Sequence, residues 1–406
     1  MRFRNSQSMR GVIWSTAFAV SVIFAATKLY GKDRSGSQPV ACQVDSAHTV
    51  PAKRLRVLSK GINISRWFNK LGVPRERPSD DVLRKLRAEG YTYVRLPVAG
   101  EVLTSSFGNN VAAKEFAARL DTAIARLRRF NFGITIDLHP DRAFRELYKN
   151  KPEEAVKLLK AIWSMLARRY VGRSADYIFF EILNEPSVKK SLWRDHAIEL
   201  IKTIRSIAKD HTLIYGPANF QEIRRLAKSV PFDDSNIVYA AHFYDPFLFT
   251  HQGAIRNPKK PWLQYLTGLP FPAKIGDDAI VSLLAELEDD DHPDPKNART
   301  AAQELRETLK NDWVDSRISK PFSKLASWAD RCQRPVIVNE VGVFRRKTPA
   351  KDLARLTASE RKKYDERQKA SRKPRENWLR AIRAAAMYYG IGMARWELTK
   401  GFGLHH

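Results

Sequence analysis

The 406-residue chain contains little cysteine and few acidic residues for its size. Its only cysteines, Cys42 and Cys332, exclude a disulfide framework and lack the spacing of a metal-binding motif. They could pair in an exported protein, but their distance in sequence leaves their distance in space open. Acidic side chains number 44 against 71 basic ones, a formal charge of +27. This charge favours anionic partners, although a basic, solvated surface is the simpler explanation.

Several motifs are also missing. No G-x-G-x-x-G turn is present, which argues against a doubly wound, dinucleotide-binding sheet, the second choice of fold. The stretch "DLHPD" contains a single histidine without a second one at coordinating spacing, so we expect neither a metal nor another cofactor. Nucleic-acid binding would depend on charge alone, since no recognition motif and no basic-aromatic repeat occurs.

The amino terminus has the layout of an export signal. Basic residues precede an uncharged, mostly apolar stretch, residues 11–27, and a polar segment follows it. We therefore predict a signal peptide or signal anchor over residues 1–30 and a linker over residues 31–55. The protein is expected in the periplasm or outside the cell. Because no clean cleavage site follows, residues 11–27 could remain as a membrane anchor.

From residue 56 onward, short apolar runs alternate with helical patterns. Eight runs are typical of buried strands: "RVLSKGINI", "YTYVRLPV", "FGITIDLHP", "YIFFEILNEP", "TLIYGPAN", "NIVYAAHFYDP", "RPVIVNEVGV" and "IGMARWEL". Stretches between them, such as "DDVLRKLRAEG", repeat apolar residues at helical spacing. Repeated β–α units predict an α/β fold, a (β/α)8 TIM barrel, as a single catalytic domain over residues 56–406. Only "TKGFGLHH" follows the last run, so the barrel could lack its final helix.

In such a barrel, the side chains at the carboxyl ends of the strands converge on one face. The residues at these positions are Arg95, His139, Asn184, Glu185, His242, Tyr244, Glu340 and Trp396. Two carboxylates from different strands are the minimum requirement for glycoside hydrolysis. One protonates the leaving oxygen, and the other attacks the anomeric carbon or activates water. The remaining residues can orient these carboxylates or contact the sugar.

Purely structural roles are the alternative for several of these positions. Arg95 and Tyr244 could serve only to satisfy loop hydrogen bonds, and His139 could be a rim histidine that binds nothing. Trp67 and Trp262 could be sugar platforms, but loop-anchoring tryptophans are as common, so we leave them out of the predicted site.

The strand-end motifs resemble those of glycoside hydrolase family 5, the cellulase family of retaining (β/α)8 enzymes. The matching stretches are "GINI", "VRLPV", "DLHP", "NEP", "HFYDPFLFTHQGA", "VNEVGV" and "WELTKGFG", in that order. The resemblance implies that Glu185 is the acid/base, Glu340 is the nucleophile and the other strand-end residues are their partners. It also implies a metal-independent bacterial endoglucanase that hydrolyses β-1,4-glucan by double displacement.

Other functions stay open at this point. Sequences of this kind also act on mannan, mixed-linkage glucan or xyloglucan, and the basic charge would suit an acidic exopolysaccharide. A barrel that binds polysaccharide without cleaving it is the non-enzymatic alternative, but the presence of both Glu185 and Glu340 argues against it. We expect a monomer with a polysaccharide substrate and no nucleic-acid partner. Any membrane association would use the amino-terminal segment.

Overall fold

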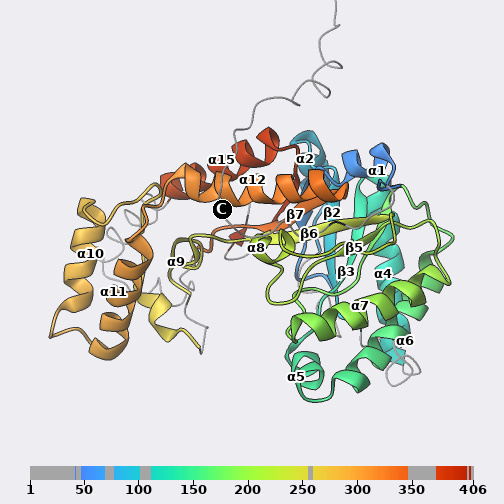
Figure 1. Ribbon diagram of the computed structural model, residues 1–406, viewed down its shortest axis with the longest axis horizontal. Coiled ribbons are helices and arrows are strands. Elements are labelled where there is room, and N and C mark those ends of the chain that lie inside the picture. The colour runs from blue at the N-terminus through green and yellow to red at the C-terminus, as the bar shows by residue number, and fades with distance from the viewer. Residues whose placement is uncertain are drawn as a thin grey trace, which may run out of the picture. The chain divides into compact units, whose positions relative to one another are not determined.

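The computed structural model describes residues 42, 47–68, 77–100, 111–254, 259–345, 372–399 and 402–403 (Figure 1). All of them belong to one unit, Val40–His406. The predicted export signal, residues 1–30, lies outside the described residues. Among the helices that are described, none combines the length and the apolar character needed to cross a membrane.

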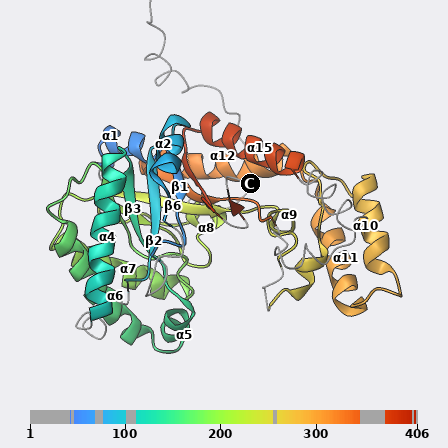
Figure 2. The same ribbon diagram turned by 180° about the vertical axis from the view of Figure 1, so that it is seen from behind.

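Parallel strands form a closed barrel in which each strand pairs with the next and β8 pairs with β1 (Figure 1, Figure 2). The strands are β1 (Lys60–Asn63), β2 (Tyr93–Val98), β3 (Gly133–Leu138), β4 (Ile178–Glu181), β5 (Leu213–Tyr215), β6 (Ile237–Phe243), β7 (Val336–Val341) and β8 (Gly392–Arg395). Every residue of β2, β3 and β6 is buried, because helices cover the outside of the barrel and side chains fill its inside. The predicted (β/α)8 barrel is confirmed, and the open doubly wound sheet is wrong.

Helices connect the strands and cover the barrel. They are α1 (Ala52–Val57), α2 (Asp80–Ala88), α4 (Val111–Arg129), α5 (Arg142–Asn150), α6 (Pro152–Tyr170), α7 (Lys190–Arg205), α8 (Ile223–Leu226), α9 (Phe247–Thr250), η2 (Pro261–Tyr265), α10 (Asp278–Glu288), α11 (Pro295–Leu309), α12 (Asp315–Cys332) and α15 (Arg372–Tyr388). Capping side chains fix several helix starts. Ser79 accepts the Val82 N–H at the start of α2, and Asp141 accepts the Phe144 N–H at the start of α5.

Between β6 and β7 the chain adds helices that a minimal barrel lacks. α10 and α11 lie side by side, and η2 packs against α11 (Figure 2). α12 then returns to the barrel and packs against α8, β7 and α15. This insertion therefore places the start of α12 beside the segment that follows β5.

Side chains inside the barrel form an apolar layer with a polar layer above it. Residues two apart on a strand share a face, so Tyr93 and Arg95 point inward together, as do Phe179 and Glu181. Tyr93 and Phe179 belong to the apolar cluster that fills the lower barrel, and Gly61 makes room for it because a Cβ there would lie 2.3 Å from the Tyr93 ring. Arg95 and Glu181 are fully buried one level higher, directly beneath the strand ends.

The described part of the expected linker packs against the barrel. Val50 is 4% exposed and belongs to the apolar cluster of the lower barrel. Arg54 donates to the Asp210 carbonyl at 2.5 Å and pairs with Asp176 at 3.2 Å. At the other end of the barrel sequence, no α-helix follows β8 within the described residues. The ring closes there through direct pairing of β8 with β1, including Ala394 with Gly61.

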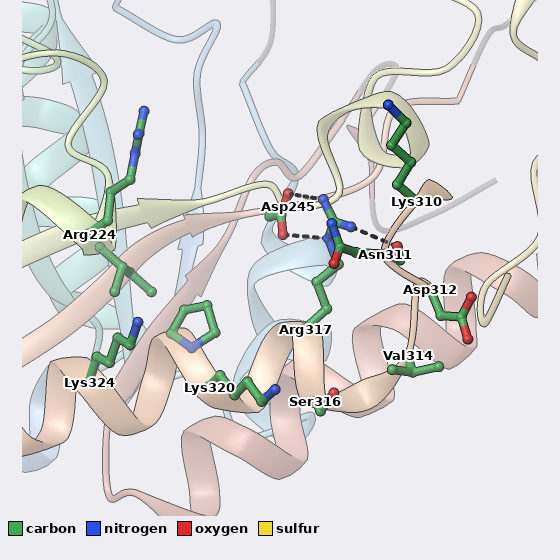
Figure 3. A pocket seen from close by; sticks show the side chains of 12 residues that line it. Arg224, Asp245, Lys310, Asn311, Asp312, Val314, Ser316, Arg317, Lys320 and Lys324 are labelled. Atoms are coloured by element: carbon green, nitrogen blue, oxygen red, sulfur yellow. Dashed lines mark hydrogen bonds and ion pairs between the residues drawn. The ribbon is translucent and has the colours of Figure 1, made fainter. Parts of the chain in front are cut away.

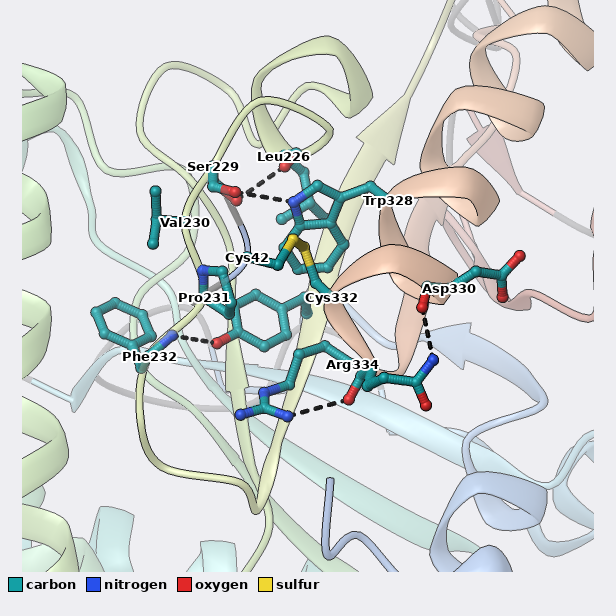
Figure 4. Close-up of a disulfide and its surroundings, with 12 residues drawn as sticks. Cys42, Leu226, Ser229, Val230, Pro231, Phe232, Trp328, Asp330, Cys332 and Arg334 are labelled. Carbon is teal, nitrogen blue, oxygen red and sulfur yellow. Dashed lines mark hydrogen bonds between the residues drawn. A yellow bond between two sulfur atoms is a disulfide. The ribbon is translucent and has the colours of Figure 1, made fainter. Parts of the chain in front are cut away.

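Cys42 and Cys332 form a disulfide with 5.1 Å between their Cα atoms (Figure 4). Cys332 is the last residue of α12 and is buried. Beside it, the Trp328 indole N–H donates to the Ser229 carbonyl at 2.8 Å (Figure 4). The bond therefore attaches the start of the described chain to the outer helix layer across a sequence separation of 290 residues.

Candidate active site

The residues predicted for the site lie at one end of the barrel, at or just after the ends of its strands, except Arg95, which lies in the middle of β2 beneath the rim. They are Arg95 in β2, His139 after β3, Asn184 and Glu185 after β4, His242 in β6, Tyr244 after it, Glu340 in β7 and Trp396 after β8. A hydrogen bond or ring contact connects each of them to another member of the set. The structure thus brings all of the predicted site residues together on one face.

Glu340 is buried and accepts hydrogen bonds from two firmly held donors. Arg95 Nη1 lies 2.6 Å from its Oε1, and the Tyr244 hydroxyl lies 2.9 Å from its Oε2. Burial and the nearby carboxylates raise the pKa of Tyr244 well above its usual value, so the phenol keeps its proton and donates it. A register shift between Ala241 and His242 sets His242 directly opposite Glu340 on the neighbouring strand.

Arg95 is fully buried at the centre of this network. Its Nε and Nη2 donate to Glu181 at 2.6 and 2.8 Å. Nη2 also donates to Asn184 Oδ1 at 2.8 Å and lies 3.1 Å from Asp137 Oδ2. Burial opposes the guanidinium charge, but the carboxylates of Asp137, Glu181 and Glu340 raise the pKa of Arg95 well above its usual value. Arg95 is therefore a permanent cation that links the interior of the barrel to its rim.

The polar layer beneath the rim is the part of the site that sequence reasoning missed. Glu181 interrupts "YIFFEILNEP", which reads as an apolar strand, and its Oε1 accepts from Asn339 Nδ2 at 2.9 Å. Asn63 Oδ1 accepts from Arg95 at 2.9 Å. Burial raises the pKa of Glu181 even though Arg95 opposes the rise. The signal that could have revealed this layer is strand alternation, since Glu181 is two residues from the inward-facing Phe179.

Glu185 has a different set of neighbours. Its backbone is left-handed, with φ 45°, and its N–H donates to Gln221 Oε1 at 2.8 Å. Its Oε1 lies 3.0 Å from His242 Nδ1, and its Oε2 lies 3.9 Å from Arg145 Nη1. Burial favours the protonated carboxyl, but the hydrogen bond and charge of His242, followed by the charge of Arg145, outweigh burial and lower the pKa of Glu185 to about 2.

His242 lies between the two rim carboxylates. Its Nδ1 is 3.0 Å from Glu185 and 3.5 Å from Glu340. Burial favours the neutral imidazole, but the charge of Glu340 and the hydrogen bond to Glu185 outweigh burial and raise the pKa of His242. Both shifts favour the histidine as the site of the proton in the Glu185–His242 pair.

A left-handed turn after β5 positions both members of this pair. Asn219, Phe220 and Gln221 have φ values of 60°, 63° and 49°. Gln221 is fully buried, its side chain accepts the Glu185 N–H, and its carbonyl accepts the His242 N–H at 2.7 Å. No motif marks Gln221 in the sequence, because a loop has no periodicity from which an inward side chain can be predicted.

His139 and Trp396 form the opposite wall of the site. Their rings are stacked, with 5.9 Å between centroids and 17° between planes. His139 Nδ1 lies 2.8 Å from Asp137 Oδ2, and Asn184 Nδ2 donates to His139 Nε2 at 3.4 Å. These contacts give His139 specific partners at the rim, and they leave the partly exposed Trp396 ring at the edge of the site.

The other two tryptophans considered as sugar platforms are buried. Trp67 is 5% exposed and stacks on Phe68, with 5.5 Å between the ring centroids. Trp262 lies in η2 and is 7% exposed. Their burial agrees with the interpretation of both residues as loop anchors.

In the described part of the chain, the side chains that could together hold a metal ion are Glu185, His242 and Glu340, whose ligand atoms lie within 4.8 Å of one another. His242 Nδ1 and Glu185 Oε1 are already engaged in a hydrogen bond with each other. Arg95 and Tyr244 both point at Glu340, so a cation would meet a positive charge and a phenolic proton there. These three side chains are therefore better arranged to exchange a proton than to coordinate a metal ion. Metal independence stays a prediction.

A closed (β/α)8 barrel with paired carboxylates at its strand ends defines the class of barrel-type glycoside hydrolases. The chain matches the family model described as cellulase (glycosyl hydrolase family 5) over residues 50–399. The chain belongs to this family, which confirms the resemblance found in the sequence motifs.

Two similar relatives are endoglucanases. Endoglucanase 3 from Fibrobacter succinogenes is 27% identical over 337 residues, which are 78% of this chain and 49% of that protein. Endoglucanase C from Acetivibrio thermocellus is 29% identical over 207 residues, which are 48% of this chain and 60% of that protein. The matched region thus spans only about half to three-fifths of these relatives.

Solved structures share the fold. Endoglucanase Cel5A from Thermotoga maritima superposes with a TM-score of 0.64 at 24% identity and covers 88% of this chain and 95% of its own. The clostridial cellulose synthase subunit Z from Clostridioides difficile superposes with a TM-score of 0.61 at 23% identity, covering 86% and 94%. At these identities the likeness supports the barrel architecture alone.

Proposed function

We propose that the protein is a retaining endo-β-glycanase that hydrolyses β-1,4-glucan by double displacement, with Glu340 as nucleophile and Glu185 as acid/base. The observation that carries the proposal is the placement of these carboxylates. They follow different strands, and one oxygen atom of each lies within 4.8 Å of the other. Retaining enzymes hold their carboxyl groups about 5–5.5 Å apart, whereas inverting enzymes leave about 6.5–9.5 Å for a water molecule.

The chemistry proceeds in two displacements. In the first, an oxygen of Glu340 bonds to the anomeric carbon while the bond to the leaving oxygen breaks, and that oxygen takes a proton from the Glu185–His242 pair. In the second, water attacks the anomeric carbon, Glu185 accepts the water proton, and Glu340 leaves as a carboxylate. Arg95 and Tyr244 hold the attacking carboxylate in one orientation throughout. We assign to Asn184 the hydrogen bond to the sugar 2-hydroxyl, a contact that strengthens in the transition state.

The acid/base role requires a proton on Glu185, although the pKa of that residue is lowered to about 2. The hydrogen bond between His242 Nδ1 and Glu185 Oε1, 3.0 Å long, supplies it, because transfer along this bond gives the protonated carboxyl. Formation of the ester removes the charge of Glu340, the largest contribution that favours protonated His242. The loss of charge on Glu340 is thereby coupled to transfer of a proton from His242 to Glu185.

The names of the curated relatives support β-1,4-glucan as the substrate. Six of the seven relatives are endoglucanases, and the seventh is a cellodextrinase. Mannan is an alternative, because one structural neighbour was solved with a mannotriose substrate. Mixed-linkage glucan and acidic exopolysaccharide are further alternatives. A reducing-sugar assay over these polymers separates them, and retention of a polymer that is never cleaved would favour a binding barrel instead.

Trapping of the covalent intermediate tests the mechanism directly. A 2-fluoro glycoside should leave an ester on Glu340, identified by peptide mass spectrometry, and proton NMR should detect the β-anomer first. Glu340→Ala should lower kcat by about 10⁴-fold or more, because the covalent route is removed. Azide should restore part of the activity as the α-azide product. An α-anomer from the unmodified enzyme, or an ester on another residue, would contradict the proposal.

Export from the cytoplasm is a further part of the proposal. The Cys42–Cys332 disulfide supports it, since disulfides persist mainly in oxidising compartments. Cell fractionation tests it: full-length protein that stays in the cytoplasm with free thiols would contradict export, and membrane association that resists carbonate would indicate an anchor formed by residues 11–27.

A further inference from the structure

A basic pocket of about 700 Å³ lies between α8, the end of β6 and α12 (Figure 3). Its lining includes Arg224 from α8, Asp245 after β6, and Arg317, Lys320 and Lys324 from α12. These positions come from three separate parts of the chain, which α12 brings together by packing against α8.

Chain connectivity places this pocket at the rim of the barrel. Asp245 directly follows Tyr244, whose hydroxyl donates to Glu340, so the two Cα atoms are about 3.8 Å apart. Arg224 comes three residues after Gln221, which accepts the backbone N–H of Glu185. The pocket is therefore on the side of the rim where β5 and β6 end, the side toward which a bound polymer could extend.

The cations of the pocket differ in how far they are neutralised. Arg317 Nε donates to Asp245 at 2.9 Å, and Arg224 forms two hydrogen bonds with Glu222, at 2.6 and 3.0 Å. Lys320 and Lys324 have no ion-pair partner within the described part of the chain, and both are exposed. Because they are four residues apart on α12, their Cβ atoms are about 5–6 Å apart on one face of the helix. The pocket therefore presents two adjacent free ammonium groups.

We propose that this pocket binds carboxylate groups on the substrate chain, so that the enzyme favours an acidic or carboxyl-substituted β-glycan over a neutral one. The inference rests on the proposed function, because it takes the polymer bound in the pocket to be the one that the active site cleaves. Lysine ammonium groups are point charges that suit single carboxylates. The guanidinium forks of Arg224 and Arg317, which would favour bidentate phosphate binding, are already occupied by carboxylates. The net charge of +27 further concentrates anionic polymers around the protein.

Carboxymethyl cellulose and hydroxyethyl cellulose provide the test, because they share a β-1,4-glucan backbone and differ in charge. For the full chain at low salt, Lys320→Gln with Lys324→Gln should lower kcat/KM on the carboxymethyl polymer about 3- to 10-fold, chiefly through KM, since exposed ion pairs contribute little each. kcat/KM on the hydroxyethyl polymer should stay within about twofold. Added salt should reduce the preference of the unmodified enzyme.

Two matched variants separate a local effect from an effect of net charge. Lys85→Gln with Lys202→Gln removes the same charge from the last turns of α2 and α7, which lie at the opposite end of the barrel, and should leave the preference unchanged. Lys320→Arg with Lys324→Arg retains the charge and should retain the preference. Equal losses in the Lys85/Lys202 and Lys320/Lys324 variants would overturn the proposal, as would a Lys320/Lys324 variant that still prefers the carboxymethyl polymer.

Affinity electrophoresis in gels that contain each polymer gives a readout that is independent of cleavage. If neither polymer is cleaved, the proposed function fails, but selective loss of retention in the carboxymethyl gel for the Lys320/Lys324 variant would still support the pocket. Absence of retention for the unmodified protein would overturn the pocket proposal. Binding to duplex DNA or to phosphatidylserine vesicles that falls by the same factor in this variant would also overturn it, because the pocket would then bind any polyanion.

Discussion

The surroundings of Glu340 and of Glu185 differ in the kind of positive charge that each carboxylate meets. Glu340 contacts Arg95, which is fully buried and permanently charged, and the Tyr244 hydroxyl. Glu185 contacts His242, whose charge depends on pH, and lies 3.9 Å from Arg145, whose side chain is 32% exposed. The nearest ionic partner of Glu340 is thus a permanent cation, whereas that of Glu185 can gain or lose a proton. His242 Nδ1 also faces Glu340, but at 3.5 Å, compared with 3.0 Å from Glu185.

This difference suits the two roles that we propose. A nucleophile has to be ionised and oriented before each attack, and a permanent cation with a hydrogen-bonding phenol meets both needs. An acid/base has to change its protonation state within each turnover, and a neighbouring histidine offers a store for that proton. The environments of the two carboxylates therefore assign the roles more specifically than their separation does.

Arg95→Met should have the largest effect, because it removes the permanent cation beside Glu340. Arg95 compensates Asp137, Glu181 and Glu340, and truncation of one partner of a buried ion pair costs about 3–5 kcal/mol. Urea denaturation should show a loss of that size, with activity below detection. A loss under about 1 kcal/mol would show that the polar layer tolerates uncompensated carboxylates.

Tyr244→Phe should have the next largest effect and should act mainly on catalysis. The phenyl ring keeps its packing against His251 and Phe402, while the hydrogen bond to Glu340 is lost. A hydrogen bond to a charged group contributes about 1.5–3 kcal/mol, so kcat should fall about 10- to 100-fold. Steady-state kinetics with an aryl β-cellobioside measure the fall, and a melting temperature within a few degrees of the parent is the control. An unchanged kcat would mean that Arg95 alone orients Glu340.

His242→Gln should shift the pH profile of kcat/KM, and it tests whether His242 is the titratable partner of Glu185. The pKa of Glu185 is lowered to about 2, so in the unmodified enzyme the basic limb of kcat/KM reports loss of the proton from His242. The pKa of His242 is raised, so this limb should lie above pH 6.5, the ordinary histidine value. Without His242, burial raises the pKa of Glu185, the carboxyl carries the proton itself, and the basic limb should move to lower pH.

The control for this shift is another rim histidine. His251 packs on Phe247, with 4.0 Å between ring centroids, and burial lowers its pKa to about 4. His251 is therefore neutral across the basic limb, and His251→Gln should leave the position of that limb unchanged. A basic limb that stays in place in His242→Gln would show that His242 does not hold the proton of the pair.

The fold and the rim of the site could be predicted because both depend on a regular feature of the sequence. Each apolar run has a polar residue in or just after its second half, and a closed parallel barrel gathers the carboxyl ends of its strands on one face, which is why the rim residues could be predicted. The start of the first strand was placed too early, since Arg56 and Val57 belong to α1. Helix α1 and strand β1 are both short, so neither shows enough of its own periodicity for the boundary between them to be placed from the sequence.

The remainder of the site could not be predicted, for physical reasons that differ by residue. Glu181 lies within a strand run, so composition predicts an apolar strand there. Its buried carboxyl is stabilised by Arg95 and Asn339, which come from other strands. Gln221 and Arg145 reach Glu185 from segments whose side-chain directions depend on tertiary structure. The helices α10 and α11 do not alternate with strands and so add nothing to the barrel pattern.

Arg145→Met should have the smallest effect, and it sharpens the comparison because it removes the same side chain as Arg95→Met from beside the other carboxylate. The Arg145–Glu185 contact is 3.9 Å long and both side chains are partly exposed, so water and salt screen it. Exposed ion pairs contribute about 0.2–1 kcal/mol, so the change in stability should be small. Converted to a rate, about 1 kcal/mol corresponds to at most about a fivefold loss in kcat/KM. The loss should shrink further as salt is added. A loss comparable to that of Arg95→Met would mean that Glu185 also depends on a fixed cation, and the proposed contrast between the two carboxylates would be wrong.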